Sequence, residues 1–146
     1  MYWPEFAKLE PELAARGREL LAEAHGYVFL ATIRRDGSPR LHPIVPILSD
    51  RGLIIAVKQT SPKLADIRRD PRIALHSTVL PPDDEEFSIR GIVHEVRGDE
   101  ARQAAVAASG TDMPPDVMLL FEVELIRVGW ATWPEQGKPI RQHWPK

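Results

Sequence analysis

Short β-branched and aromatic runs, each ended by turn-forming residues, fill the chain from residue 27 onwards and constrain its fold more than any other feature. Residues 27–33 (YVFLATI) lead into the turn residues Arg35–Ser38, and residues 53–57 (LIIAV) follow a second turn at 49–52. Runs of this kind are typical of β-strands, and the turns between them are typical of hairpins. Because parallel strands need crossovers of about a dozen residues or more, the pattern predicts an antiparallel sheet.

Short helices are expected before and between the strands. Apolar residues at helical spacing from Phe6 to Ala24 predict a short turn near Pro4–Leu9 and a main helix from about Pro11, which Gly26 ends. Later helices are expected at 62–69 and 99–109, with an acidic loop at 81–86. The six predicted strands are residues 27–33, 40–48, 53–57, 72–79, 87–97 and 118–128.

This order of elements predicts a mainly β fold with helical additions, α+β by count, built as an antiparallel barrel. The first three strands are expected to form a meander. Pro43 and Pro46 have no amide donor, so strand 40–48 is expected at an edge or at a bulge, where free carbonyl groups can meet a ligand. We expect one domain over residues 1–146, with a helical segment (1–26), a barrel (27–132) and a C-terminal tail (133–146).

The composition favours a cytoplasmic protein. The 146 residues include no cysteine, which excludes disulfides and thiolate metal ligands. A formal net charge of −2 argues against a nucleic-acid binder that depends on positive charge. No apolar run approaches the roughly 20 residues of a membrane span, and acids stand where a secretion signal would be basic. We therefore expect neither a nucleic-acid nor a membrane partner.

An anion site is one interpretation of the residues Thr60-Ser61-Pro62-Lys63, which stand where a strand passes into a helix. At such a junction free amides, the helix dipole, a hydroxyl and an ammonium can converge on a phosphate. The other interpretation, which the spacing alone favours, is a capped helix with one solvated lysine.

Histidines and arginines offer further candidates. Arg40 and His42 alternate on the second strand, so they share a face, where they either position an anionic or ring-bearing ligand or are surface groups. His76 and His94 fall on neighbouring predicted strands and are candidates to come together. No spacing such as HExxH supports a metal site, and we expect no metal.

Tryptophan is concentrated near the C-terminus, at Trp130, Trp133 and Trp144. These side chains either plug one end of the barrel or stack on a flat cofactor. The sequence has no glycine-rich phosphate motif of the Rossmann or P-loop kind and no G-x-S-x-G elbow, so kinase and hydrolase chemistry lack their usual markers.

Three segments together resemble the pyridoxamine 5′-phosphate oxidase-like family, the FMN-binding split barrels. They are residues 30–40 (LATIRRDGSPR), 53–57 (LIIAV) and 61–75 (SPKLADIRRDPRIAL), and the similarity spans about Tyr27 to Val79. The resemblance implies a six-stranded split barrel that forms a homodimer with two cofactors at the subunit interface. It also implies that Ser61 and Lys63 meet the FMN phosphate.

The resemblance further implies which residues line the cofactor. The isoalloxazine ring or its chain would lie against backbone groups of Pro43, Ile44 and Val45 and of Ala56, Val57 and Lys58. A tryptophan of the partner, Trp133 among the three candidates, would close the pocket. With Arg40, His42, Thr60, Ser61 and Lys63, these residues form the predicted cofactor site.

Departures from the family pattern argue against true pyridoxamine phosphate oxidation. In genuine oxidases the resemblance implies an arginine where this chain has His42, a lysine near Ile47 and an arginine at Pro62, all serving the FMN phosphate. It also implies a longer chain with an arginine-rich C-terminal segment for the substrate phosphate. We therefore predict an oxidoreductase that uses FMN, or the deazaflavin F420, on a small-molecule substrate that the sequence does not name.

Two alternatives to this hypothesis remain open at the sequence level. The first is a non-catalytic protein that binds or stores flavin or haem. Haem needs an axial ligand, for which His42, His76 and His94 are candidates. The second is a dimeric scaffold with an empty cleft.

Overall fold

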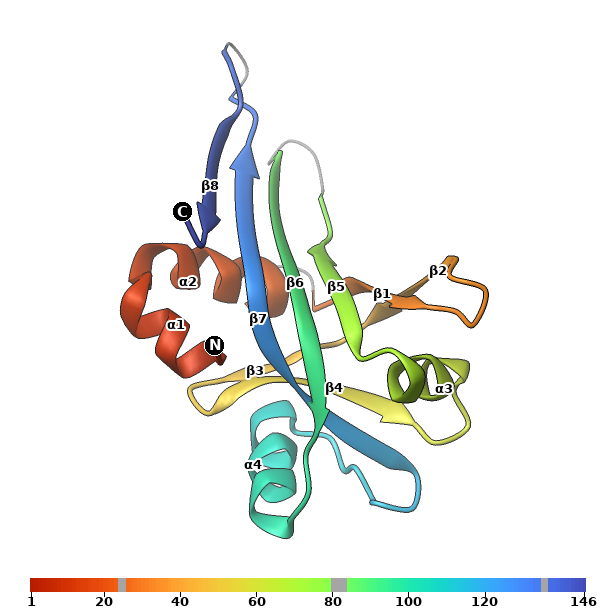
Figure 1. Cartoon of the computed structure of the whole chain (residues 1–146). Coiled ribbons are helices and arrows are strands. Elements are labelled where there is room, and N and C mark those ends of the chain that lie inside the picture. The colour runs from red at the N-terminus through yellow and green to blue at the C-terminus, as the bar shows by residue number, and fades with distance from the viewer. Residues whose placement is uncertain (24–25, 80–83, 135–136) are drawn as a thin grey trace.

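The computed structural model describes residues 1–23, 26–79, 84–134 and 137–146 (Figure 1). Its helices are α1 (Trp3–Leu9), α2 (Pro11–Arg18), the π-helical turn η1 (Glu19–Glu23), α3 (Pro62–Arg69) and α4 (Asp99–Ser109). Its strands are β1 (Val28–Ile33), β2 (Pro39–Ile44), β3 (Ile47–Ser49), β4 (Gly52–Lys58), β5 (Arg72–Ser77), β6 (Glu85–Glu95), β7 (Met118–Thr132) and β8 (Ile140–Trp144). Ala24 and the first residues of the predicted acidic loop lie outside the described residues.

The strands form one antiparallel sheet in the order β2-β1-β5-β6-β7-β4-β3, with β8 paired to β7. The long strand β7 connects the parts of this sheet, because its start pairs with β4 and its end pairs with β8. Figure 1 shows β3 and β4 crossing the lower part of β6 and β7, while β1 and β2 extend to the right of the view. The structure confirms the predicted fold class, a mainly β split barrel with added helices.

The predicted strand 40–48 is two strands, and the predicted meander is wrong. β2 pairs with β1 and β3 pairs with β4, at opposite ends of the strand order. Pro46 separates β2 from β3 because it has no amide hydrogen to donate to a neighbouring strand. At this point the chain passes from one edge strand of the sheet, β2, to the other, β3. The edge position expected for this segment is confirmed, and the break at residues 45–46 is the split of the barrel.

β8 is the other addition to the six predicted strands, which makes eight in the described part of the chain. Residues 140–144 (IRQHW) lack the alternation of apolar and polar residues that marks a half-buried strand, and all but Trp144 are exposed. Trp144 packs edge-on against Phe6 of α1, with ring centroids 5.5 Å apart. This contact holds the C-terminal strand against the helical segment.

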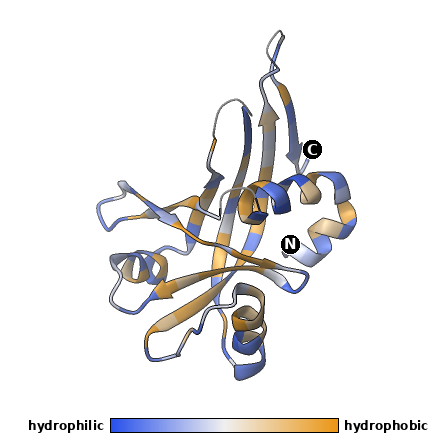
Figure 2. Cartoon of the chain, turned by 180° about the vertical axis from the view of Figure 1, so that it is seen from behind, coloured by the Kyte–Doolittle hydropathy of each residue, from blue (hydrophilic) through white to orange (hydrophobic). Residues whose placement is uncertain are grey.

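Helices α1 and α2 and the turn η1 close one side of the barrel. Trp3 and Phe6 are fully buried in the same cluster as the strand residues. Gly17 is the point of closest approach, because a Cβ there would lie 2.5 Å from Cζ of Phe87 and 2.8 Å from Cη2 of Trp3. Figure 2 shows hydrophobic residues concentrated in the central strands and hydrophilic ones at the loop tips. No helix in the described ranges is long and apolar enough to cross a membrane.

Candidate functional site

The junction between β4 and α3 folds as its sequence predicts. Ser61 is extended and caps α3: its Oγ accepts a hydrogen bond from the Lys63 amide at 3.3 Å, and Pro62 occupies the first helical position. The Ser61 amide donates to the Lys58 carbonyl at 2.9 Å, which closes the turn. The hydroxyl of Ser61 and the ammonium of Lys63 are thereby placed at the N-terminus of one helix.

A groove of about 780 Å³ opens beside this junction. One side is formed by β4, the start of α3 and the break between β2 and β3, and the other by the end of α4 and the segment that leads into β7. Predicted site residues that line it are Ile44, Val45, Ala56, Lys58, Ser61 and Lys63. The rest of the lining is mostly apolar, so the groove combines a basic end with an apolar body.

His42 contacts Lys63 at the basic end, although His42 itself does not line the groove. His42 Nδ1 is 3.3 Å from Lys63 Nζ. Burial, followed by the charges of Lys63, Arg40 and Arg34, lowers the pKa of His42, and burial followed by Arg40 lowers the pKa of Lys63. An opposite charge favours the protonated form of each group, so an anion bound here would be stabilised by them.

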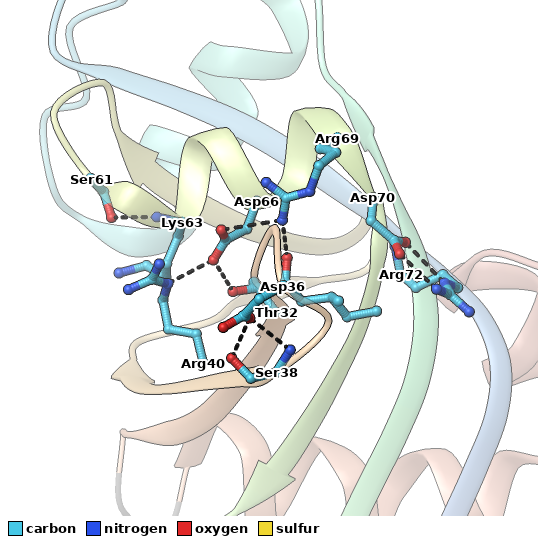
Figure 3. Close-up of polar contacts among 11 residues, drawn as sticks. Thr32, Asp36, Ser38, Arg40, Ser61, Lys63, Asp66, Arg69, Asp70 and Arg72 are labelled. Carbon is cyan, nitrogen blue, oxygen red and sulfur yellow. Dashed lines mark hydrogen bonds and ion pairs between the residues drawn. The ribbon is translucent and has the colours of Figure 1, made fainter.

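Arg40 does not line the groove, because its side chain points to Asp66 of α3 (Figure 3). The Asp66 carboxylate is 3% exposed and accepts hydrogen bonds from Arg40 Nε at 2.6 Å and from Thr32 Oγ1 at 2.9 Å. Burial tends to raise the pKa of Asp66, but these hydrogen bonds outweigh it and hold the pKa below its usual value. Arg69 completes the cluster, with bonds to Asp66 and to the Ile33 carbonyl. The cluster joins α3 to β1 and β2.

Four other predicted site residues lie away from the groove. Val57 is in the barrel core, 1% exposed, because alternation in β4 turns it inward. Pro43 is exposed on β2 opposite Phe29, on the other face of the strand from His42. Thr60 is exposed in the turn before α3, and Trp133, 38% exposed, follows β7.

The histidines at 76 and 94 do not come together. Their strands are neighbours, but His76 lies opposite Ser88 and His94 lies further along β6, opposite Glu122. Each has an acidic neighbour instead, since His76 is 3.3 Å from Glu86 and His94 is 2.8 Å from Glu124. No group of three or more possible metal ligands occurs within the described residues.

The tryptophans serve mainly as core residues. Trp130 is 9% exposed and belongs to the main cluster, and Arg16 lies over its ring at 5.6 Å. Trp144 packs against the same cluster. Trp130 and Trp144 therefore pack in the way that the first alternative, plugging of one barrel end, predicts. Within the described residues, Trp133 is the one exposed side chain of the three C-terminal tryptophans.

One wall of the groove was missed by sequence reasoning. It consists of residues from the end of α4 to the start of β7: Ala108, Ser109, Thr111, Asp112, Met113, Pro114, Val117 and Met118. No local motif marks this segment. The pairing of Lys58 with Met118 and of Val57 with Leu119 in the β4–β7 ladder brings it beside the β4–α3 junction.

A separate hollow of about 530 Å³ lies on the outer side of the sheet. It contains none of the predicted site residues and is lined largely by apolar side chains of β1, β5, β6 and β7. Arg72 and Arg90 also line it. We take the groove beside α3 as the candidate site because it contains Ser61 and Lys63 at a helix N-terminus, together with other predicted site residues.

Comparison with known families fits this arrangement. The model of the pyridoxamine 5′-phosphate oxidase family matches residues 14–128, which include the whole β4–α3 junction. The chain belongs to this family. The match covers all of the barrel strands except the end of β7 and β8. A comparison with curated protein sequences found no match.

Solved structures share the family's fold. A NimC/NimA family protein of Clostridium acetobutylicum has a TM-score of 0.67 at 16% identity, over 88% of this chain and 90% of that one. An FMN-binding, pyridoxamine 5′-phosphate oxidase-related protein of Nostoc punctiforme has a TM-score of 0.61 at 16% identity, over 90% and 94%. A heme-binding protein of Mycobacterium smegmatis has a TM-score of 0.66 at 18% identity, over 88% of this chain but 57% of that one. At these identities the likeness is one of fold.

Proposed function

We propose that this protein is a flavin-binding oxidoreductase that holds FMN in the groove beside α3 and acts on a small-molecule substrate. The observation that carries the proposal is the convergence of Lys63 and Ser61 at one end of a mostly apolar groove, with His42 in contact with Lys63. FMN has the matching chemistry, with a phosphate at one end and a flat, largely apolar ring system at the other.

The basic end suits a phosphate monoester. Lys63 supplies a charge, Ser61 supplies a hydroxyl, and the start of α3 supplies the positive end of a helix dipole. The buried carboxylate of Asp66 on α3 is already paired with Arg40. The local field therefore favours an anion, and charge-assisted bonds to it are stronger than neutral ones.

The chain's own residues bind and orient the cofactor. Ile44, Val45 and Ala56 offer an apolar surface to the ring, and the groove walls exclude water from it. Bound FMN supplies hydride transfer, and the protein contributes binding, orientation and electrostatics. No acid–base pair of side chains is needed for this chemistry.

A substrate other than pyridoxamine phosphate is proposed. The resemblance implies a lysine near Ile47 that serves the FMN phosphate in genuine oxidases. Ile47 is 6% exposed and packs with Ala105, Met113 and Leu120, so it does not supply that phosphate ligand. Oxidation of vitamin B6 phosphate is not proposed for this chain.

We further propose a homodimer formed through the outer face of the sheet, which shares no residue with the lining of the groove. The outer face of the sheet exposes a continuous apolar surface, made of Phe29, Ala31, Ile33, Pro39, Leu41, Pro43, Ala74, Ile92 and Ile126. Phe29 is 40%, Leu41 63% and Ile126 48% exposed. Apolar patches of this extent are typical of protein interfaces.

Charge on the outer face also favours a second copy as its occupant. Arg90 and Arg127 lie directly opposite each other on β6 and β7, and neither forms an ion pair within the described parts of the chain. Like charges in register destabilise a sheet unless a counter-charge is near. An acid of a partner subunit would supply that charge.

The first test is the absorption spectrum of the purified protein after incubation with FMN, F420 or haemin and passage through a desalting column. We expect a retained flavin spectrum with FMN, and its loss in Lys63→Met but not in the matched control Lys8→Met, an exposed lysine on α1. If the protein retained F420 and not FMN, the cofactor would be the deazaflavin instead of FMN. A Soret band with haemin alone, or no retained chromophore, would contradict the proposal.

Turnover needs a separate measurement. Reduction of the bound flavin by a nicotinamide, followed as bleaching under anaerobic conditions, distinguishes an oxidoreductase from the alternative, a non-catalytic binding or storage protein. We expect bleaching followed by reoxidation when an electron acceptor is added. A flavin that stays oxidised with every donor tested would favour storage.

A further inference from the structure

The segment 110–117, which we call the groove wall, is fixed from two sides by residues of other elements. Arg102 of α4 donates from Nη1 to the carbonyls of Met113 at 2.6 Å and Met118 at 3.1 Å. Gln59, in the turn before α3, donates from its amide to the Val117 carbonyl at 2.9 Å and from Nε2 to the Pro115 carbonyl at 3.0 Å. The groove wall is therefore tied both to α4 and to the phosphate-binding junction.

The guanidinium of Arg102 donates hydrogen bonds to backbone carbonyls and not to a carboxylate. It is half-buried and takes part in none of the ion pairs among the described residues. A guanidinium that donates to carbonyl groups forms charge-assisted hydrogen bonds, which are stronger than neutral ones. Since its two acceptors stand at opposite ends of the turn, one side chain fixes the width of that turn.

The groove wall is also stiff internally. Val117 and Met118 both donate their amides to the Pro114 carbonyl, at 3.0 and 2.9 Å. Pro114 and Pro115 each have a fixed φ. Met113 is buried in the second core cluster with Ile47, which anchors the wall to β3.

The wall residues that line the groove are apolar from residue 113 onwards (Met113, Pro114 and Val117), with Met118 of β7 beside them, whereas Thr111 and Asp112 are polar. They face a cavity whose other side carries Ile44, Val45 and Ala56. Thioether and aliphatic groups make favourable contacts with aromatic rings. The body of the ligand is thus expected to be flat and uncharged, whereas its anionic group belongs at Lys63.

We propose that Arg102 is a positioning residue that holds the groove wall at the distance needed to grip the flat, apolar part of the ligand, independently of the phosphate. The proposal rests on the proposed function insofar as the ligand is a flavin. Arg102 and Gln59 would then control ring binding, and Lys63 would control phosphate binding. The two contributions are separable by comparing FMN with riboflavin, which has the same ring and no phosphate.

The test is a fluorescence titration of Arg102→Met with both ligands. We expect about tenfold weaker binding of FMN and of riboflavin alike, so that the ratio of their dissociation constants stays at the wild-type value. Arg102→Lys keeps the positive charge but loses the planar guanidinium with its several donors. Its affinity for both flavins is expected to lie between those of wild type and Arg102→Met. The matched control Arg97→Met, an exposed arginine before α4, is expected to bind as wild type.

Hydrogen exchange supplies a readout of the wall itself. The amides of Val117 and Met118 are expected to exchange faster in Arg102→Met, and those of α3 at the wild-type rate. Faster exchange in the wall with unchanged affinity for both flavins would overturn the proposal, as would a change in the FMN to riboflavin ratio. If Arg102→Met does not fold, Gln59→Ala, an exposed position, tests the same prediction.

The proposed function and this inference fail in different ways. If wild type binds neither flavin, the proposed function fails, and the wall is tested with anilinonaphthalene sulfonate, which joins a flat apolar body to an anion. Its binding is then expected to fall in Arg102→Met and, because the groove is filled, in Val117→Trp, at a position 45% exposed. Loss of probe binding in Val117→Trp with unchanged binding in Arg102→Met would overturn the inference as well.

Discussion

His42 Nδ1 lies 3.3 Å from Lys63 Nζ, at the basic end of the groove. The ammonium of Lys63 can donate to Nδ1 of a neutral His42 ring. Burial, followed by the charges of Lys63, Arg40 and Arg34, lowers the pKa of His42. We therefore expect the binding of a phosphate beside this pair to be coupled to the uptake of a proton.

This coupling predicts that FMN affinity depends on pH through His42. A bound phosphate raises the pKa of the ring, so lowering the pH from 8 to about 6 strengthens FMN binding. In His42→Gln this gain disappears. The phosphate itself also takes up a proton, with a pKa of about 6, in both proteins, so the difference between them isolates the histidine. Calorimetric titrations at several pH values measure it, and identical profiles would exclude the coupling.

The contact also bears on stability without ligand. Because the pKa of His42 is lower in the folded protein than in the unfolded chain, the unfolded chain binds more protons between those two values. Folding is consequently weakened as the pH falls through about 6.5, the ordinary pKa of histidine. Urea midpoints of wild type are expected to drop more than those of His42→Gln over this interval.

Asp66 is predicted to be the residue on which the placement of α3 depends. In Asp66→Ala the half-buried Arg40, whose side chain is 21% exposed, loses its counter-charge, and we expect a loss of about 3 kcal/mol in the free energy of unfolding. Since the pKa of Asp66 is below its usual value, its contribution is present above about pH 4 and is lost as the pH falls below that. Urea unfolding at pH 7 and pH 3 measures both effects. Equal loss at the two pH values would contradict this account.

Gly17→Ala tests the packing of the helical segment on the barrel. A methyl group there would lie 2.5 Å from Cζ of Phe87, which is fully buried and has no room to move. We expect a loss of about 1–3 kcal/mol, measured by urea unfolding. Gly129→Ala is the control, because its Cβ would meet only the Ser88 hydroxyl at 3.0 Å. Equal effects of the two substitutions would show that Gly17 is not a close contact.

The outer face is predicted to form the dimer. Leu41→Lys, at a position 63% exposed on β2, places a charge in that face and is expected to give a monomer by light scattering. Leu9→Lys on α1, at a position 57% exposed, is the matched control and is expected to leave the dimer intact. A monomeric wild type, or a dimer that survives Leu41→Lys, would remove the outer face as the interface.

The sequence predicts most of the fold because its local signals agree with the final structure. The Ser61 cap, the Pro62 start and the alanine-rich run at 99–109 gave the bounds of α3 and α4. Local signals do not determine which strands pair with each other. Whether residues 40–48 pair with one neighbour or with two depends on Pro46 and on the closure of the barrel, and neither is visible in local alternation.

The site divides in the same way. Ser61 and Lys63 could be predicted, because strand-to-helix junctions have recognisable chemistry. Arg40 was assigned to the ligand because nothing in the spacing reveals that the buried Asp66 takes its guanidinium. The groove wall escaped prediction for a related reason: residues 110–117 reach the site only through the pairing of β4 with β7.

The most direct test of the account is the ratio of the dissociation constants for riboflavin and FMN, in wild type and in Lys63→Met. A charge-assisted hydrogen bond contributes about 1.5–3 kcal/mol, and about 1.4 kcal/mol corresponds to a factor of ten. Wild type is therefore predicted to bind FMN at least about tenfold more tightly than riboflavin, and Lys63→Met to bind the two nearly equally. A ratio that is unchanged by the substitution would contradict the assignment of the phosphate to Lys63.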